Sequence, residues 1–257
     1  IDIEVDSHDG FPEPDDAKYD VTAITVKFDN IYYVWSMIDY TVKNEDVVYK
    51  RCESESHLMR EFFDWWSIKS PDVITGWNTR GFDIPYLVNR AAKIDPALPG
   101  KLSPWGLVNP RTMNNEFGKV NVYDIVGVQQ LDYIELFKKF TLNTLGRQES
   151  YRLDHIAFVV LGDRKLSYEE HGNLHTLYRD DPEKFIDYNI KDVELVDRLD
   201  EKLGLLSLAF TLSYKGGVNF DECMGTTGIW DSIIYRVLNS QLIAVPPKVE
   251  RTSCGRA

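Results

Sequence analysis

Carboxylates at three places along this 257-residue chain have the types and spacings of a divalent-metal site. Asp2 and Glu4 are separated by one residue in an apolar stretch, so a strand there places both on one face. Two such carboxylates repel each other unless a cation neutralises them, and hard cations such as Mg²⁺ prefer oxygen ligands. Taken alone, this pair also fits a solvated edge strand.

The second place is Asp83, at the start of a helix predicted over residues 83–94 with Pro85 in its first turn. An aspartate at that point fits an N-cap, which requires no catalysis and does not exclude it.

The third place is the pair Tyr188 and Asp192, four residues apart in a helix predicted over residues 181–203. The apolar Phe185 and Leu195 direct their common face toward the core. An inward-facing aspartate is costly unless it is paired or bound to metal. Pairing with an arginine, or capping of a turn, remains open.

Together these four carboxylates can hold two divalent ions, which lie roughly 3.5–4 Å apart in such sites. One ion lowers the pKa of a bound water, and the other stabilises a leaving oxygen. Both Mg²⁺ and Mn²⁺ suit carboxylate ligands. Tyr188 can orient the water by hydrogen bonding but is a poor base, because the ordinary pKa of a tyrosine is near 10.

The elements that must position these residues are typical of an α/β chain. Strands are predicted first, a strand–helix alternation follows, and helices come last, which favours a central mixed β-sheet flanked by helices. A polar β-hairpin is predicted over residues 111–125. The strands are expected at residues 1–5, 21–28, 31–36, 46–49 and 72–76, and the helices at 56–69, 83–94, 132–140, 153–161, 181–203 and 225–242.

The formal net charge of −12 is unusual for a nucleic-acid binder. Either nucleic acid is not the partner, or the acidic residues gather at metal sites and solvated faces while a larger protein supplies positive potential.

No apolar run is long enough to span a membrane. Cys52, Cys223 and Cys254 match no zinc spacing and fit a reducing cytosol. His171 and His175 have helical spacing, but their polar surroundings favour a solvated turn. Trp65, Trp66 and Trp230 are interpreted as core or flanking aromatics.

Three motifs, in this order, resemble the exonuclease motifs of the DEDDy group: Asp2-Ile3-Glu4, then Asn78 with Phe82-Asp83, then Tyr188 with Asp192. The surrounding sequence resembles family B DNA polymerases and covers nearly the whole chain. The segments that carry this likeness are residues 74–78, 82–86, 150–154 and 160–165, with residues 2–5, 9–14 and 131–139 similar to polymerases of the T-even phage type.

The resemblance implies a ribonuclease-H-like exonuclease fold over residues 1–215, with a β-hairpin inserted at about 109–127 and a helical segment at 216–257 leading toward a polymerase palm domain. It implies the 3′→5′ proofreading exonuclease portion of a replicative DNA polymerase. The partners would be single-stranded or frayed primer DNA and the remainder of the polymerase, and no membrane is expected among them. The expected location is the cytoplasm, which for a phage protein is that of the host cell. The implied ligands of two divalent ions are Asp2, Glu4, Asp83 and Asp192, with Tyr188 assisting the water and with Phe11, Asn78 and Phe82 contacting the DNA end.

Two alternatives remain beside this interpretation. A free-standing DEDD nuclease usually has a histidine in the place of Tyr188 and lacks the insert at residues 94–130. A DNA-holding module with a silent site would fit a shortened first strand, since chain ends are poorly tied down. The polymerase palm and fingers motifs are not in this sequence, so we expect a fragment or one piece of a split polymerase.

Overall fold

The computed structural model describes residues 1–8, 10–115, 118–167 and 173–245. The chain forms two compact units, Ile1–Leu206 and Ser207–Ala257. All of the candidate site residues belong to the first unit.

A four-stranded mixed sheet lies at the centre of the first unit, in the order β1 (Asp2–Val5), β2 (Val21–Phe28), β3 (Ile31–Ser36) and β4 (Val47–Arg51). The pairs β1–β2 and β2–β3 are antiparallel, whereas β3–β4 is parallel. The two residues between β2 and β3, Asp29 and Asn30, have φ values of 50° and 62°. Asp and Asn tolerate this left-handed conformation, which matches the twist of a two-residue hairpin turn.

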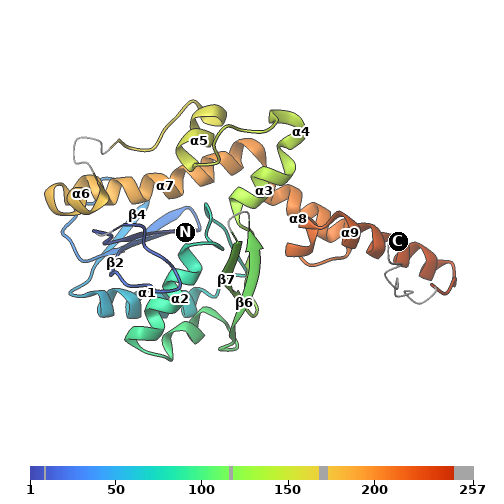
Figure 1. Cartoon of the computed structure of the whole chain (residues 1–257), viewed down its shortest axis with the longest axis horizontal. Helices are drawn as coiled ribbons and strands as arrows, with labels where there is room; N and C mark the ends of the chain where they lie inside the picture. The colour runs from blue at the N-terminus through green and yellow to red at the C-terminus, as the bar shows by residue number, and fades with distance from the viewer. Residues whose placement is uncertain (9, 116–117, 168–172, 246–257) are drawn as a thin grey trace, which may run out of the picture. The chain divides into compact units, whose positions relative to one another are not determined.

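Helices cover both faces of the sheet (Figure 1). On one face, α1 (Glu55–Lys69) and α2 (Asp83–Ile94) pack against alternate strand residues, including Ile3 and Val5. On the other face, α6 (Leu174–Asp180) and α7 (Pro182–Leu203) pack against Ala23 and Val34. The alternation predicted for the first strand is therefore confirmed, because its apolar side chains enter the α1–α2 layer and leave the opposite face for the carboxylates.

A short parallel pair, β5 (Val73–Ile74) and β8 (Gln129–Gln130), lies beside the start of β1. The amino group of Ile1 donates a hydrogen bond to the Thr75 carbonyl oxygen at 3.0 Å. A separate antiparallel pair is formed by β6 (Val108–Asn115) and β7 (Gly118–Ile125), and residues 116–117 of the predicted hairpin lie outside the described residues.

The remaining elements of the first unit are short. They are η1 (Leu98–Leu102), α3 (Tyr133–Phe140), α4 (Leu142–Leu145) and α5 (Leu153–Leu161). The predicted bounds of α5 are confirmed, and α3 begins one residue later than predicted, because Asp132 caps it by accepting a hydrogen bond from the Ile134 amide at 3.2 Å. The sequence did not predict η1, α4 or α6, which have too few turns to establish a helical period.

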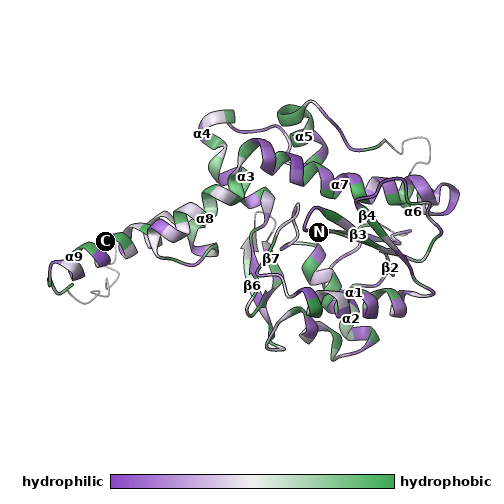
Figure 2. Ribbon diagram, turned by 180° about the vertical axis from the view of Figure 1, so that it is seen from behind, coloured by the Kyte–Doolittle hydropathy of each residue, from purple (hydrophilic) through white to green (hydrophobic). Residues whose placement is uncertain are grey.

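The second unit contains most of α8 (Leu205–Gly216), together with η3 (Asp221–Met224) and α9 (Thr226–Ser240). Hydrophobic and hydrophilic residues are mixed along α9 (Figure 2). Trp230 is 59% exposed, so it is not a core residue. The helix ends at Ser240, two residues before the end predicted at residue 242. Within the described part of the chain, no helix is both long and apolar enough to cross a membrane.

Candidate active site

Strand β1 and helix α7 bring three carboxylates together. One oxygen each from Asp2, Glu4 and Asp192 lies within 4.8 Å of the others. Asp192 and Tyr188 are both buried on the inner side of α7, as their spacing predicts. Asn189 of the same helix donates a hydrogen bond to Asp2 Oδ2 at 2.7 Å, which fixes the orientation of that carboxylate against the helix.

Asp83, on α2, lies beside this group but is not one of the three carboxylates that come within 4.8 Å of each other. The N-cap position is Phe82, which makes no capping bond, and Asp83 is the first helical residue. Its Oδ1 accepts a hydrogen bond from the Ile3 amide at 3.0 Å. The interpretation of Asp83 as a capping residue is therefore wrong: its carboxylate instead ties α2 to the strand that carries Asp2 and Glu4.

The carboxylates occupy an environment that disfavours their negative charge. Burial, with repulsion from Asp192, raises the pKa of Glu4 to about 8. Burial raises the pKa of Asp83 to about 7, and burial together with the charges of Asp192, Asp83 and Glu4 raises the pKa of Asp2 well above its usual value. Charge of one sign concentrated in a low-dielectric site is stabilised by a cation.

The donor set fits a divalent cation. All of the atoms are carboxylate oxygens, which hard cations prefer. Asp192 Oδ1 is buried and has no hydrogen-bond partner among the described residues. A buried acceptor without a partner is costly, and a metal ion would satisfy it. These residues can therefore hold a metal ion.

Lys165 is a site residue for which the sequence assigned no role. Its Nζ contacts Asp192 Oδ2 and donates a hydrogen bond to the Tyr188 hydroxyl at 3.1 Å. Burial alone would lower the pKa of Lys165, but the neighbouring Asp192, Tyr188 and Asp2 raise it overall, so the side chain stays charged. Burial and the Asp192 charge raise the pKa of Tyr188, which keeps its hydroxyl protonated. The only sequence signal for Lys165 was its place in a segment that resembles the polymerase family.

Asp2, Lys165 and Tyr188 line an open groove of about 1210 Å³. Phe11 and Asn78 also line it, and so do residues of β6 and β7, among them Met113, Val120 and Val122. The groove is less acidic than the whole chain, because five basic residues line it beside four acidic ones. The basic residues are Arg80, Lys138, Arg152, Arg164 and Lys165, and the acidic ones are Asp2, Asp132, Glu135 and Asp154.

The turn that presents Asn78 to the groove is held by Asp132. Asn78 has a left-handed φ of 67°. The amides of Asn78 and Arg80 each donate a hydrogen bond to the Asp132 carboxylate at 2.9 Å. Burial raises the pKa of Asp132 to about 6. No sequence pattern indicated this positioning role, because Asp132 is more than fifty residues away from Arg80 along the chain.

The two aromatic residues predicted to contact DNA are placed differently. Phe11 is 70% exposed, which excludes a core role for it. Phe82 is partly buried and its ring lies 5.7 Å from that of Phe11, centroid to centroid, so it supports Phe11 from behind. A smaller cavity of about 450 Å³, lined in part by Ile1 and Trp65, contains none of the candidate carboxylates.

The chain thus has a mixed α/β fold and a cluster of carboxylates, of which Asp2 lines a groove. These features define a protein with a candidate divalent-metal centre. Residues 1–156 match the family described as DNA polymerase family B, exonuclease domain, and the chain belongs to that family. It is 30% identical over 274 residues to the DNA-directed DNA polymerase of Escherichia phage RB69, and 31% identical over 273 residues to that of Enterobacteria phage T4.

These two alignments cover 96% and 95% of this chain but 30% of each relative. The chain is also 30% identical over 181 residues to the DNA polymerase delta catalytic subunit of Bos taurus, an alignment that covers 65% of this chain and 15% of that protein. The chain therefore spans about a third of the length of its phage relatives.

Proposed function

We propose that this chain is the 3′→5′ proofreading exonuclease portion of a replicative family B DNA polymerase. It would hydrolyse the 3′-terminal phosphodiester of single-stranded or mispaired primer DNA. The observation that carries the proposal is the convergence of Asp2, Glu4 and Asp192 within 4.8 Å at the edge of a groove. The family match supports the same activity.

In this proposal Asp2, Glu4, Asp83 and Asp192 hold two divalent ions, either Mg²⁺ or Mn²⁺. When bound, such ions supply a hydroxide nucleophile at neutral pH and stabilise the charge on the leaving oxygen. The protonated hydroxyl of Tyr188 orients the attacking water by hydrogen bonding. In the same groove, Lys165 contributes a fixed positive charge beside the scissile phosphate, where negative charge increases during the reaction.

The DNA end would bind across the groove. Phe11 presents an exposed ring that can stack on an unpaired base without reading its sequence, and Phe82 supports that ring. Asn78 would contact the terminal nucleotide from the turn that Asp132 holds. The β6–β7 pair lines the same groove, which supports a role for this inserted hairpin in separating primer from template.

We further infer a ribonuclease-H-like fold for this domain, because the family assignment favours it and the mixed sheet with helices on both faces agrees with it. The exonuclease domain would extend over residues 1–215, with residues 216–257 leading to the polymerase palm. The phage relatives favour a place in the host cytoplasm beside the rest of the polymerase.

The test is digestion of a 5′-labelled single-stranded oligonucleotide by the purified chain, in Mg²⁺ and in EDTA. We expect a metal-dependent ladder that shortens from the 3′ end, and faster digestion of a mispaired than of a paired end. Asp192→Asn should abolish digestion, and Tyr188→Phe should slow it less. Glu201→Gln, an exposed carboxylate on the same helix, is the matched control and should digest at the wild-type rate.

Two outcomes would contradict the proposal. Digestion by Asp192→Asn at the wild-type rate would show that the metal-ligand assignment is wrong. Failure of the folded wild-type chain to digest, while it still binds single-stranded DNA, would favour a DNA-holding module. A free-standing DEDD nuclease is disfavoured because the chain belongs to the polymerase family.

A further inference from the structure

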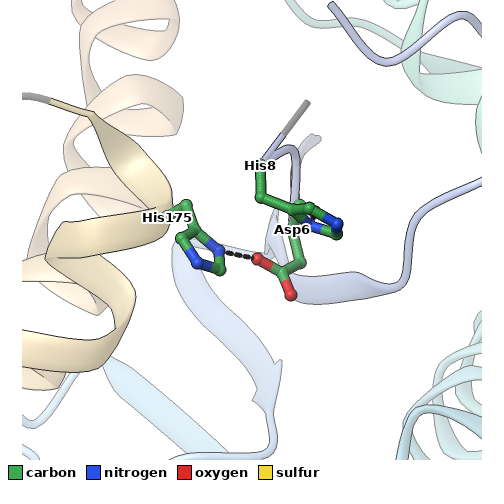
Figure 3. A group of neighbouring side chains, drawn as sticks. All are labelled: Asp6, His8 and His175. Carbon is green, nitrogen blue, oxygen red and sulfur yellow. Dashed lines mark hydrogen bonds and ion pairs between the residues drawn. The ribbon is translucent and has the colours of Figure 1, made fainter. Parts of the chain in front are cut away.

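A second group of metal-binding side chains lies outside the carboxylate centre. Asp6 and His8 come from the segment that follows β1, and His175 comes from α6. One ligand atom of each residue lies within 4.8 Å of the other two. Figure 3 shows the three side chains together, with His175 directed at Asp6. The interpretation of His175 as part of a solvated turn is wrong, and His171 lies outside the described residues.

From this geometry we propose that Asp6, His8 and His175 form a binding site for Zn²⁺, separate from the carboxylate centre. Two imidazoles and one carboxylate are a donor set that suits zinc, and three protein ligands leave one position for water. Mg²⁺ prefers oxygen ligands and is poorly suited to this set. The two sites are therefore distinguished by ligand chemistry: oxygen at one, mainly nitrogen at the other.

The distances allow the site to close with small movements. Zinc bonds of about 2.0–2.1 Å in a tetrahedron place neighbouring ligand atoms about 3.3 Å apart. Atoms now within 4.8 Å need to move by no more than about 1.5 Å. The hydrogen bond between His175 Nδ1 and Asp6 Oδ1 would open, and the more distant atoms would approach, through rotation of the side chains. His8 is exposed, and its ring lies 5.6 Å from that of His175 and 5.1 Å from that of Tyr19, centroid to centroid, so it is already beside the other two ligands. His175 is 15% exposed and Asp6 is 29% exposed, so water and ions reach both.

The backbone on each side of the site is already held in place. The Asp6 amide donates a hydrogen bond to the Asp20 carbonyl oxygen at 2.9 Å, and the Ser7 amide donates to the Val5 carbonyl oxygen at 2.8 Å. On the other side, α6 is capped by Asn173, which accepts a hydrogen bond from the Thr176 amide at 2.7 Å. Leu177, one turn further along the helix, is fully buried in the sheet core. A site built on anchored segments loses little conformational entropy when it binds a metal.

The consequence of zinc binding would be a cross-link between two distant parts of the chain. Asp6 and His175 are 169 residues apart in sequence. The linked segment begins two residues after Glu4 and leads to the exposed Phe11. Zinc would thus brace the loop that joins the carboxylate strand to the residue proposed to stack on DNA. The expected result is a Zn²⁺-dependent rise in the thermal midpoint of the chain.

The test uses the whole purified chain and Zn²⁺ alone as the probe, in buffer with millimolar Mg²⁺ to occupy the carboxylate centre. We expect one equivalent of Zn²⁺ by equilibrium dialysis, and an X-ray absorption spectrum with imidazole scattering. His175→Ala and His8→Ala should each weaken binding more than about 100-fold, since loss of even an outer partner of a zinc ligand costs about 10–100-fold. Circular dichroism checks that these variants are folded.

Two controls isolate the site. His57→Ala removes a partly buried histidine that is paired with Glu61, away from the proposed site, and this variant should bind Zn²⁺ as the wild type does. Asp192→Asn should also keep the imidazole-bound Zn²⁺, so failure of the exonuclease proposal leaves this measurement intact. No Zn²⁺ uptake by the wild type in the presence of Mg²⁺, or equal uptake by the His8→Ala and His175→Ala variants, would overturn the inference.

Discussion

Replacement of Glu4 by glutamine tests the electrostatics of the carboxylate centre without any measurement of nuclease activity. Folding raises the pKa of Glu4 from 4.5 to about 8, because burial and the nearby Asp192 disfavour its charge. A carboxyl group whose pKa is raised binds its proton more tightly in the folded than in the unfolded chain. Its contribution to stability is therefore complete below pH 4.5 and is lost as the pH rises to 8.

The size of this effect follows from the two pKa values. One pKa unit corresponds to about 1.4 kcal/mol, so ionisation of Glu4 lowers the free energy of unfolding by up to about 5 kcal/mol as the pH rises from 4.5 to about 8. Coupling to Asp192 and Asp83 divides this amount among the group. In EDTA, the free energy of unfolding of the wild type should fall by several kcal/mol between pH 5 and pH 9. Glu4→Gln carries no charge to bury, so its curve should be flatter by at least about 2 kcal/mol.

The assay is urea unfolding followed by tryptophan fluorescence at several pH values, in EDTA and in Mg²⁺. A cation in the centre stabilises the charged carboxylates, so Mg²⁺ should restore wild-type stability at high pH and should help Glu4→Gln less. Glu201→Gln, exposed on α7, should behave as the wild type does. A wild-type free energy in EDTA that does not fall between pH 5 and 8, or an equal fall in Glu4→Gln, would refute this reasoning.

Three further predictions concern the elements around the centre. Phe11→Ala should weaken binding of single-stranded DNA in EDTA by about 1–3 kcal/mol, as measured by fluorescence anisotropy. Trp105 is also an exposed aromatic residue but does not line the groove, so Trp105→Ala should bind DNA as the wild type does. Gly76→Ala should lower the free energy of unfolding by about 1–3 kcal/mol, because the added Cβ would collide with the Ile1 carbonyl oxygen at the start of β1. Arg90→Met should lower the free energy of unfolding, measured in urea, by about 3 kcal/mol, because it leaves the buried Glu55 carboxylate without the Arg90 guanidinium that pairs with it. Unchanged stability in Gly76→Ala or in Arg90→Met would contradict the contacts on which these two predictions rest.

Much of the local structure could be predicted from the sequence because it depends on periodicity. The alternation at residues 1–5 separated the face that carries Asp2 and Glu4 from the apolar face. The helices α2 and α5 have the predicted bounds. The four-residue spacing of Tyr188 and Asp192 placed both on the buried side of α7. Each of these features is set by residues a few positions apart, for which backbone geometry fixes the direction of the side chains.

The short elements escaped prediction for the same reason. The helix α6 has about two turns, too few to establish a helical period, so the polar residues around His175 predict a turn where the structure has a helix. The charge of the whole chain was also a poor guide to the groove, because five basic side chains from four parts of the chain gather along its walls.

The sequence by itself determined which residues have metal-binding chemistry and which face of each long element they occupy. Only the tertiary structure decided that Asp83 accepts a hydrogen bond from the Ile3 amide instead of capping its helix. It also decided that Lys165 pairs with Asp192 and that His175 faces Asp6. These contacts join positions between 27 and 169 residues apart. Periodicity fixes where a side chain points relative to its own helix or strand, whereas the packing of the layers decides which partner it meets.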